Sequence, residues 1–449
     1  MNLFTLLQKR AAAGRPVRVG LVGAGKFGSM FLSQVPHIPG LDVAAIADLS
    51  PERARQACRR VGWRDERIAQ TRFTDDALAM IAGDDLEVMI EATGHPAAGI
   101  KHCREATRQG KHSVMVNVEA DALAGPLLAR EAEAAGLVYS LAYGDQPALI
   151  CEMVDWARSI GMTVVAAGKG TKYLPAYHNA TPDTVWGHYG ITPEKAAEGG
   201  MNPQMFNSFM DGTKSAIEMA AVANATGLAA PDRGLAFPPC GVDDLPQVLR
   251  PGQQGGEGGQ LERSGQVEVV SSLERDGRPV FRDLRWGVYV VFEAPNDYAA
   301  RCFREYGLVT DGSGRRAALY KPYHLIGLEL AISVLSATLR GEPTGAPIGW
   351  HGDVAATAKR DLKPGELLDG EGGYCVWGKL LPASQSLRKG VLPMGLAQGI
   401  KLKRPVAAGQ VLTWEDVALV ESDPSYLFRR QMTQLFAPPQ DGAAAQRGS

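Results

Sequence analysis

The 449-residue chain lacks the features that mark several specialised classes of protein. Its six cysteines are scattered singly, with no Cys-x-x-Cys pair and no Cys/His cluster; they stand at positions 58, 103, 151, 240, 302 and 375. This spacing argues against a zinc site built from them and for a reducing compartment. No stretch of about 18 apolar residues occurs, so we expect no membrane-spanning helix. The first residues also lack the long apolar run of a signal peptide, which favours a cytoplasmic protein.

Neither positive nor negative charge is in large excess in the sequence. There are 47 Lys and Arg against 49 Asp and Glu, and the formal net charge is −2. We therefore expect no surface for nucleic acid and no membrane partner. The hydrophobic content of 45% and charged content of 21% are ordinary for a soluble globular protein. A chain of this length predicts two or three domains, each with its own core.

A glycine-rich turn stands near the start of the chain. Residues 17–22 form a short apolar run that leads into Gly23-Ala24-Gly25-Lys26-Phe27-Gly28, and an apolar helical stretch follows at once. A strand, a glycine turn and a helix start in this order bind the pyrophosphate of a dinucleotide. We expect Gly23 to permit the turn, Gly25 to let the phosphates approach and Gly28 to let helix and strand pack closely. Lys26 and Phe27 complete the predicted cofactor turn.

An acidic residue follows at the spacing that dinucleotide sites use. The next predicted strand, 42–47, ends in Asp48, which lies 20 residues after Gly28. An acid at this place meets the ribose hydroxyls of the adenosine and favours NAD(H). Arg53 and Arg55 come shortly afterwards and are suited to a 2′-phosphate, so NADP(H) stays open.

Strands and helices then alternate to about residue 150. The predicted order is strand 86–91, helix 97–109, strand 112–116, helix 122–135 and strand 137–142. This pattern predicts a doubly wound parallel sheet over a first domain of residues 1–150. Ligands in such sheets lie beyond the carboxyl ends of the strands, which places near the nicotinamide Gly94, His95, Asn117, Glu119 and Asp145. For His95 the alternative is a helix-capping histidine in a loop.

A second domain is predicted over residues 151–345, and its central feature is a helix from Asn202 to Thr226. The helix is apolar nearly all round, yet four polar residues fall within roughly 60° of one another: Asn207, Asp211, Lys214 and Glu218. One interpretation is a pair of ion pairs on a solvated edge of the helix. The other is an active-site row in which Lys214 exchanges a proton with a reacting carbonyl oxygen, Asp211 and Glu218 support it, and Asn207 contacts the substrate.

Three further residues of this domain are candidate substrate contacts. Lys169 and Lys172 lie among glycines after a predicted strand, which suits an anionic group on a substrate. The alternative for both is a solvated loop. His324 lies near the start of a mostly apolar helix expected from Tyr320 to Leu339, where it either faces the cleft or is a satisfied core histidine.

The remaining chain predicts a small β-rich domain over residues 346–437 and a disordered tail over 438–449. No acid/base or metal constellation occurs in this part of the sequence, which favours a structural or oligomer-forming role. No metal site is assigned in the chain. If a divalent ion binds, its oxygen ligands would be Glu119, Asp145 and Glu218.

Four parts of the sequence together resemble one family. They are the glycine turn with Ala47-Asp48, the segment Phe-Met-Asp-Gly-Thr-Lys-Ser-Ala-Ile-Glu-Met at 209–219, the stretch 323–329 and the tail. This combination is similar to the homoserine-dehydrogenase-like oxidoreductases with a C-terminal SAF domain, which include the 1-deoxy-D-xylulose 5-phosphate reductoisomerase-like (DRL) enzymes. The similarity covers nearly the whole chain.

The resemblance implies a Rossmann domain, a central α+β catalytic domain and an SAF tail in a homo-oligomer. It also implies NADPH-dependent conversion of 1-deoxy-D-xylulose 5-phosphate to 2-C-methyl-D-erythritol 4-phosphate in isoprenoid biosynthesis. Homoserine dehydrogenases similarly use a lysine with acidic neighbours, which matches Lys214 with Asp211 and Glu218. We predict an NAD(P)H-dependent oxidoreductase acting on a small anionic carbonyl substrate. The alternatives are a homoserine or sugar-acid dehydrogenase without isomerisation, and a regulator that senses NAD(P) without chemistry.

Overall fold

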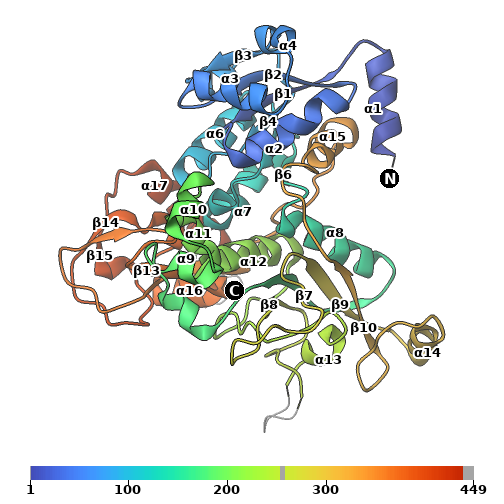
Figure 1. The fold of residues 1–449 in the computed structure, drawn as a ribbon, viewed down its shortest axis with the longest axis vertical. Coiled ribbons are helices and arrows are strands. Elements are labelled where there is room, and N and C mark those ends of the chain that lie inside the picture. Colours follow the sequence, from blue (N-terminus) through green and yellow to red (C-terminus); the bar gives the residue numbers. More distant parts are fainter. Residues whose placement is uncertain (1, 253–257, 438–449) are drawn as a thin grey trace, which may run out of the picture.

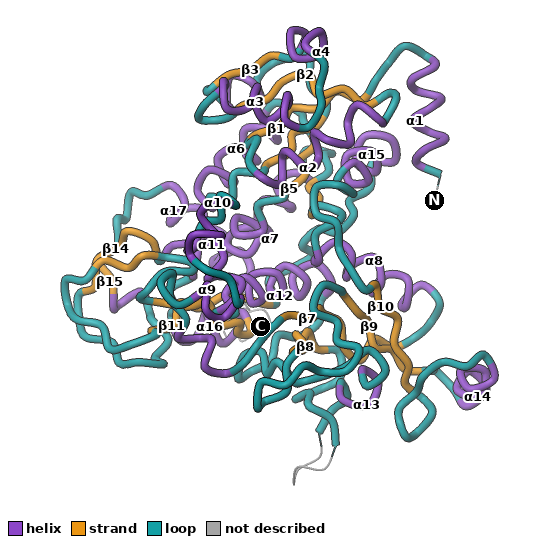
Figure 2. The backbone as a smooth tube through the Cα atoms, in the orientation of Figure 1, coloured by secondary structure: helices purple, strands orange, loops and turns teal. Residues whose placement is uncertain are grey.

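The computed structural model describes residues 2–252 and 258–437 (Figures 1 and 2). The predicted disordered tail, 438–449, lies outside the described residues. Three lobes are visible in Figure 1: an upper lobe built from the start of the chain, a lower lobe around a second sheet, and a lower lobe built from the end of the chain. Within the described part of the chain, every helix is too short or too polar to cross a bilayer.

The upper lobe contains the predicted doubly wound sheet. Its strands are β1 (Val17–Val22), β2 (Leu41–Ala47), β3 (Arg72–Thr74), β4 (Val88–Glu91), β5 (His112–Met115) and β6 (Tyr139–Leu141). They lie in the order β3-β2-β1-β4-β5-β6, and every neighbouring pair is parallel. The reversal of strand order beside β1 creates the crevice in which such sheets bind ligands. The prediction of a Rossmann-like first domain is confirmed.

Helices cover both faces of this sheet. They are α2 (Lys26–Gln34), the one-turn helix η1 (Val35–His37), α3 (Pro51–Arg60), α4 (Asp65–Gln70), α5 (Ala77–Ile81), α6 (Pro96–Arg108) and α7 (Val118–Ala134). The helix predicted from Ala122 begins earlier, at Val118, because Asn117 caps it. The N-terminal α1 (Leu3–Ala12) packs beside α15 (Ala331–Arg340) against the same core.

The position of α15 corrects one predicted boundary. Residues 322–330 do not form the expected helix, and the helix begins only at Ala331. Gly327 lies in this preceding loop with φ +77°, and a Cβ there would lie 2.6 Å from Met30 Cβ. This glycine therefore lets the loop approach α2 closely, next to the glycine turn. Because α15 then buries its apolar face on the Rossmann sheet, this part of the expected second domain packs with the first.

The second lobe is built on a four-stranded mixed sheet. Its strands are β7 (Thr163–Thr171), β8 (Gln266–Ser271), β9 (Val288–Glu293) and β10 (Arg316–Lys321), in the order β10-β9-β7-β8. β7 and β8 are parallel, and the other two pairs are antiparallel. One face is covered by α8 (Gln146–Ser159) and α12 (Thr213–Thr226), and the other packs against residues 240–249, which include α13 (Leu245–Val248), and against Leu261. The lobe also contains η2 (Pro175–Asn179), α9 (Val185–Tyr189), α10 (Pro193–Glu198), α11 (Pro203–Met210) and α14 (Asp297–Glu305).

The prediction of a single helix from Asn202 to Thr226 is wrong, because this segment forms two helices. Asn202 caps α11 as expected, and Gly227 ends α12 in a left-handed conformation. Between them, Asp211 ends α11 and Gly212 adopts φ +89°, so the helical path is interrupted. Glycine adopts this conformation without steric cost, whereas residues with a Cβ rarely do. The break changes the direction in which Asp211 points relative to Lys214.

The third lobe is small and β-rich, as predicted. β11 (Gly352–Ala358) pairs antiparallel with β13 (Val376–Pro382), and a second sheet has the order β12 (Leu367–Asp369), β14 (Gln398–Leu402) and β15 (Val417–Ala418). Its remaining elements are α16 (Ala383–Lys389), η3 (Met394–Leu396), η4 (Trp414–Asp416) and α17 (Pro424–Phe436). β11 and β13 pack on α12, and α17 packs on α6 and α7. Helix α12 is therefore in contact with all three lobes, since it also packs on α7.

Candidate active site

The glycine turn has the shape that a dinucleotide needs. Gly23 adopts φ +94°, and a Cβ there would lie 2.7 Å from the Ala92 carbonyl oxygen. A Cβ at Gly28 would overlap the Gly23 carbonyl oxygen, so helix and turn pack as closely as predicted. Gly25, in contrast, has nothing within 4 Å of its missing Cβ, which leaves its backbone open to a phosphate. Because α2 starts directly after it, the amide groups at the helix start are available to an anion.

Asp48 lies where the sequence places it, at the end of β2 beside the turn. Its Oδ2 accepts from the backbone N–H of Ala24 (3.0 Å), and its Oδ1 accepts from the N–H of Ser50 (3.0 Å). The Arg53 guanidinium also pairs with Oδ1 at 2.6 Å. The carboxylate is buried, whereas the Arg53 side chain is 61% exposed. A ribose hydroxyl would compete with Arg53 for Asp48, and the exposed guanidinium is suited to a 2′-phosphate.

Residues after β4 and β5 form the predicted second edge of the site. The His95 Nδ1 accepts from the Ala98 N–H (3.4 Å), so the capping interpretation of this histidine is confirmed. Asn117 caps α7 through its Oδ1, and its Nδ2 donates to the His95 carbonyl oxygen (3.0 Å). Asn117 therefore fixes the loop that contains Gly94. Gly94 itself adopts φ +70° with open space beside it.

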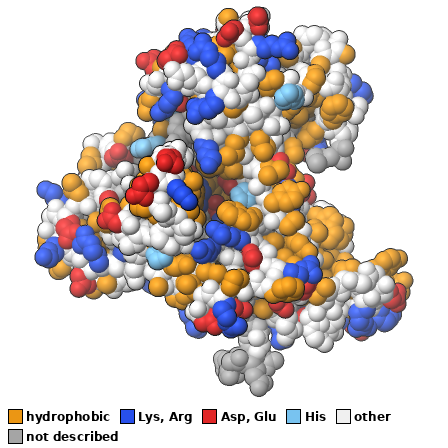
Figure 3. All heavy atoms as spheres, in the orientation of Figure 1, with side chains coloured by type: hydrophobic (Ala, Val, Ile, Leu, Met, Phe, Trp, Pro, Cys, Tyr) orange, Lys and Arg blue, Asp and Glu red, His pale blue; other side chains and the backbone are white. Residues whose placement is uncertain are grey.

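These elements meet at a cavity of about 820 Å³. Seven of the predicted site residues line it: Gly25, Lys26, Phe27, Gly94, His95, Glu119 and Lys214. The opposite wall comes from the third lobe, with Glu371 and residues 398–401. Figure 3 shows that the surface is hollowed between the upper lobe and the lower lobes. The dinucleotide turn and Lys214 thus share one space, as the sequence predicts.

Lys214 is the cation of this cavity next to α7. Its Nζ lies 2.5 Å from the Glu119 Oε1, and both side chains are largely buried. Burial alone would lower the pKa of Lys214, but the nearby carboxylates of Glu119, Glu218, Asp145 and Glu371 outweigh it and raise that pKa well above its usual value. The ammonium group therefore keeps its charge at neutral pH. A fixed positive charge in a partly dry cavity stabilises negative charge that develops on a substrate oxygen.

The expected acidic neighbours of Lys214 are arranged differently from the prediction. Glu218 forms a buried ion pair with Lys169 and not a direct contact with Lys214. Asp211 lies beyond the helix break, where its Oδ2 pairs with Lys359 Nζ at 2.8 Å. The prediction of one polar row on one helix face is therefore wrong, because Gly212 separates the two halves. Glu119, which was predicted as a substrate contact, takes the place next to Lys214.

The remaining predicted substrate contacts do not line the cavity. Asn207 is fully buried and donates through Nδ2 to the carbonyl oxygens of Ala180 and Gly372. Lys169 lies within β7 and not in a loop, where its Nζ also donates to Gln146 Oε1 (3.0 Å). Because its charge is matched by Glu218, Lys169 is not free to bind an anion.

Lys172 and His324 are held at the edge of the second lobe. The Lys172 Nζ donates to the His188 carbonyl oxygen (2.6 Å), and the His324 Nδ1 lies 2.7 Å from the Trp286 carbonyl oxygen. Lys172 and Lys169 therefore do not form the joint anion site expected from the sequence. His324 is neither a core histidine nor a cavity residue; it lies on the loop before α15.

Two acidic groups near Lys214 have raised pKa values. Burial, followed by the charge of Glu218, raises the pKa of Asp145 to about 6, although this residue also caps α8. Burial, followed by the charge of Glu119, raises the pKa of Glu371 to about 8. Glu371 was missed by sequence reasoning, because it belongs to a loop of the third lobe that only tertiary packing brings to Lys214.

Two of the three carboxylates considered for a divalent ion are engaged with lysines. Glu119 holds Lys214, and Glu218 holds Lys169. Among the described residues, no group of three or more His, Cys, Asp or Glu side chains has the arrangement of a metal site. In this arrangement Glu119 and Glu218 are not free to ligate a divalent ion, and the donors present do not fit one.

Three family models match successive parts of the chain. Residues 17–117 match an oxidoreductase family (GFO/IDH/MocA) with an NAD-binding Rossmann fold. Residues 144–330 match the catalytic domain of the oxidoreductase DRL, and residues 354–418 match the SAF domain. The chain therefore combines an NAD-binding Rossmann domain, an oxidoreductase catalytic domain and a C-terminal SAF domain, in the predicted order.

Solved structures show similarity to parts of the fold. A mutant 3-ketoreductase from Actinomadura kijaniata, in complex with TDP-benzene and NADP, has 19% identity and a TM-score of 0.27 over 36% of this chain and 50% of its own. A scyllo-inositol dehydrogenase from Lactobacillus casei with NAD(H) and scyllo-inositol has 15% identity and a TM-score of 0.27 over 36% and 47%. A myo-inositol dehydrogenase from the same organism with NAD(H) and myo-inositol has 16% identity and a TM-score of 0.28 over 39% and 52%. The chain thus spans about half the length of each. No curated protein matches it.

Proposed function

We propose that this protein is an NAD(P)H-dependent oxidoreductase that reduces a small, anionic carbonyl compound. The observation that carries the proposal is the Lys214 ammonium, held 2.5 Å from Glu119 in the cavity that the glycine turn also lines. A reduced nicotinamide supplies a hydride to a carbonyl carbon. The residues around the cavity bind the dinucleotide, orient the carbonyl and stabilise the charge on its oxygen.

Each part of the site has a separate task in this proposal. Gly25, Lys26 and Phe27 hold the pyrophosphate at the start of α2, with open space at Gly25 for close approach. Lys214 directs its ammonium at the carbonyl oxygen, and its raised pKa keeps it charged throughout the neutral range. Glu119 fixes the ammonium by a charge-assisted hydrogen bond, which limits the positions that Nζ can take.

The cavity is suited to a substrate with charge. Lys26, Lys214 and Lys401 supply cationic groups along its lining, while the apolar wall includes Phe209, Ile217 and Ile326. A small molecule with one carbonyl and one anionic group matches this combination better than an apolar compound does.

The finer proposal is a reductoisomerase of the DRL type. It converts 1-deoxy-D-xylulose 5-phosphate to 2-C-methyl-D-erythritol 4-phosphate with NADPH, and serves isoprenoid biosynthesis in the cytoplasm as a homo-oligomer. Its support is the sequence resemblance together with the match of residues 144–330 to the DRL catalytic domain. A homoserine or sugar-acid dehydrogenase would use the same lysine and turn without a rearrangement of the carbon skeleton.

A substrate panel separates these candidates. Purified protein is incubated with NADPH or NADH and deoxyxylulose phosphate, and with NAD or NADP and homoserine or sugar acids, while absorbance at the nicotinamide band is followed. Oxidation of NADPH by deoxyxylulose phosphate, with methylerythritol phosphate as product, supports the reductoisomerase. Turnover of a hydroxy acid alone supports the dehydrogenase. Cofactor binding without turnover of any compound contradicts the enzyme and supports a nucleotide-sensing regulator.

A further inference from the structure

A loop of the SAF domain enters the active-site cavity. The loop joins β12 to β13, and its residues Gly370 and Glu371 line the same space as Lys214. Gly370 and Gly372 adopt φ values of +74° and +67°. A Cβ at Gly372 would overlap the backbone carbonyl of Gln204 on α11. The loop is thus shaped to lie directly on α11, with Glu371 between the two glycines.

Side chains of α11 hold this loop in place. Gln204 Nε2 donates to the carbonyl oxygen of Glu371 (2.9 Å), and Asn207 Nδ2 donates to that of Gly372 (2.8 Å). The Ser208 hydroxyl donates to the Glu371 carboxyl group itself. One face of α11 therefore fixes both the backbone of the loop and the side chain of Glu371.

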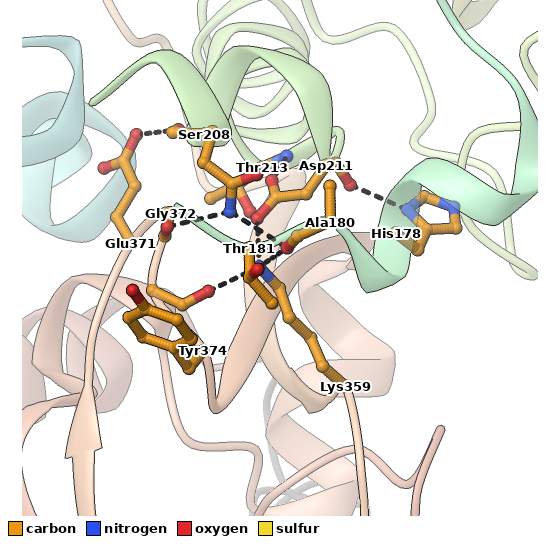
Figure 4. A network of polar contacts seen from close by, with 12 residues as sticks. His178, Ala180, Thr181, Ser208, Asp211, Thr213, Lys359, Glu371, Gly372 and Tyr374 are labelled. Atoms are coloured by element: carbon orange, nitrogen blue, oxygen red, sulfur yellow. Dashed lines mark hydrogen bonds and ion pairs between the residues drawn. The ribbon is translucent and has the colours of Figure 1, made fainter. Parts of the chain in front are cut away.

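The ion pair of Asp211 and Lys359 anchors the other end of the loop (Figure 4). Lys359 Nζ donates to the carbonyl oxygens of Gly373 (2.6 Å) and Ala180 (2.7 Å). Its charge is matched by Asp211 at the helix break. Asp211, which the sequence placed beside the reacting carbonyl, therefore contacts the lysine that anchors this loop.

We propose that Glu371 is the proton donor of the active site and that the Asp211–Lys359 pair is a positioning device for it, so that the SAF domain completes the catalytic centre. This inference rests on the proposed carbonyl reduction. It also gives the tail a chemical role, where the sequence favoured a structural one.

The balance of the reaction requires such a donor. Two electrons arrive at the carbonyl carbon with the hydride, the carbon–oxygen π pair moves to oxygen, and that oxygen takes a proton. Glu371 supplies this proton, is left as a carboxylate and is reprotonated from solvent, because its side chain is only partly buried. Lys214 is the weaker acid of the two, since its pKa is raised well above its usual value.

The surroundings of Glu371 keep it protonated at neutral pH. Burial and the charge of Glu119 on α7 raise its pKa to about 8, and Asp211 acts in the same direction. Lys214 on α12 and the Ser208 hydroxyl on α11 act in the opposite direction. General acids work best with a pKa near the operating pH, which is the value reached here.

The decisive variant is Glu371→Gln, compared with Glu366→Gln as a control. Glu366 is an acid of the same domain that pairs with Arg360 and does not line the cavity. We expect Glu371→Gln to lower kcat at least ~10²-fold, as loss of a general acid predicts, with no change in the Kd for NADPH. Because Glu371 must be protonated to act, the wild-type rate should fall above pH 8. This fall should be absent in Glu371→Gln, and the pH at which it occurs should shift in Asp211→Asn. The control should behave as the wild type in both respects.

A second measurement needs no substrate. We expect the Tm of Glu371→Gln to rise relative to that of the wild type between about pH 4.5 and pH 8, because over this range the native wild type keeps the Glu371 proton that the unfolded chain loses. If the difference in Tm between Glu371→Gln and the wild type does not change with pH, Glu371 is not protonated in the native state as proposed. Retention of kcat and of the alkaline limb by Glu371→Gln overturns the donor role but leaves the proposed function standing, provided that turnover still depends on Lys214. Absence of any turnover by the wild type overturns the proposed function, and the donor role with it.

Discussion

Asp211 and Lys359 form a buried ion pair across the boundary between the catalytic and SAF domains, with Oδ2 and Nζ 2.8 Å apart and both side chains at most 2% exposed. Asp211 comes from the break between α11 and α12, and Lys359 directly follows β11. Desolvation raises the pKa of Asp211, while the Lys359 charge opposes that rise. Each member of the pair therefore depends on the other for its buried charge.

The first prediction concerns the stability that this pair provides. Lys359→Met leaves Asp211 buried without a cation, which typically costs about 3–5 kcal/mol. Denaturant unfolding of Lys359→Met should show this loss, and Lys363→Met, an exposed lysine of the same domain, should not. Adding Asp211→Asn to Lys359→Met should recover part of the loss. If Asp211→Asn destabilises the Lys359→Met protein as much as it destabilises the wild type, the two residues do not interact as described.

The second prediction concerns the choice between NADPH and NADH. The exposed guanidinium of Arg53 lies beside Asp48, at the expected place of the adenosine ribose. Arg53→Ala should weaken NADPH binding roughly 10- to 100-fold, the effect of losing a charge-assisted hydrogen bond of about 1.5–3 kcal/mol. NADH binding should be kept, because Asp48 is then free for both ribose hydroxyls.

Fluorescence titration with both cofactors measures this difference. Arg59→Ala is the matched control, since Arg59 lies on the same helix but faces Glu52 and Asp65. Equal weakening of NADH and NADPH by Arg53→Ala would show that Arg53 acts on the turn as a whole and not on a 2′-phosphate.

The third prediction follows from Asp121, a fully buried acid on α7. The Tyr139 hydroxyl donates to its Oδ1 (2.7 Å), and its Oδ2 has no hydrogen-bond partner in the described part of the chain. Burial raises the pKa of Asp121 to about 7, against the opposing hydrogen bond from Tyr139. In the unfolded chain the pKa is about 3.9.

The sign of the resulting pH dependence is fixed by these two values. Between about pH 4 and pH 7 the native state keeps the proton of Asp121 and the unfolded state loses it, so stability falls as pH rises, by at most about 1.4 kcal/mol per pH unit for this group. Asp121→Asn removes this contribution. The variant should therefore gain stability over the wild type from pH 4 to pH 8 in thermal unfolding, whereas parallel curves would contradict a raised pKa.

Local sequence signals were sufficient for most of the sheet of the first domain, although they did not predict β3 or the helices between residues 49 and 85. The glycine turn and the alternation of apolar runs depend on neighbours in the chain, and so they predicted the parallel sheet, the turn around Gly25 and the place of Asp48. The cap at Asn202 depends on a few adjacent residues and was equally visible. Asn117, in contrast, was expected near the nicotinamide, and the helix that it caps was placed too late in the chain. Lys214 stood out because a lysine on an apolar helix needs a partner.

The partners of Lys214 could not be predicted from local sequence signals. Helical periodicity assumes an unbroken helix, and the left-handed Gly212 interrupts the row and removes Asp211 from it. Glu119 and Glu371 reach Lys214 from two other domains, so no spacing in the sequence connects them. The start of α15 was placed too early for a similar reason, since Gly327 serves close packing against α2 and has no signature in hydrophobic periodicity.

The central claim is that Lys214 acts on the substrate oxygen beside a dinucleotide bound at the glycine turn. Its most direct test is the paired measurement of kcat and of the Kd for NADPH in Lys214→Ala. We expect kcat to fall at least ~10²-fold while the Kd for NADPH is unchanged, because the proposed role places the lysine at the substrate and not at the pyrophosphate. A variant that turns over as fast as the wild type would contradict the claim.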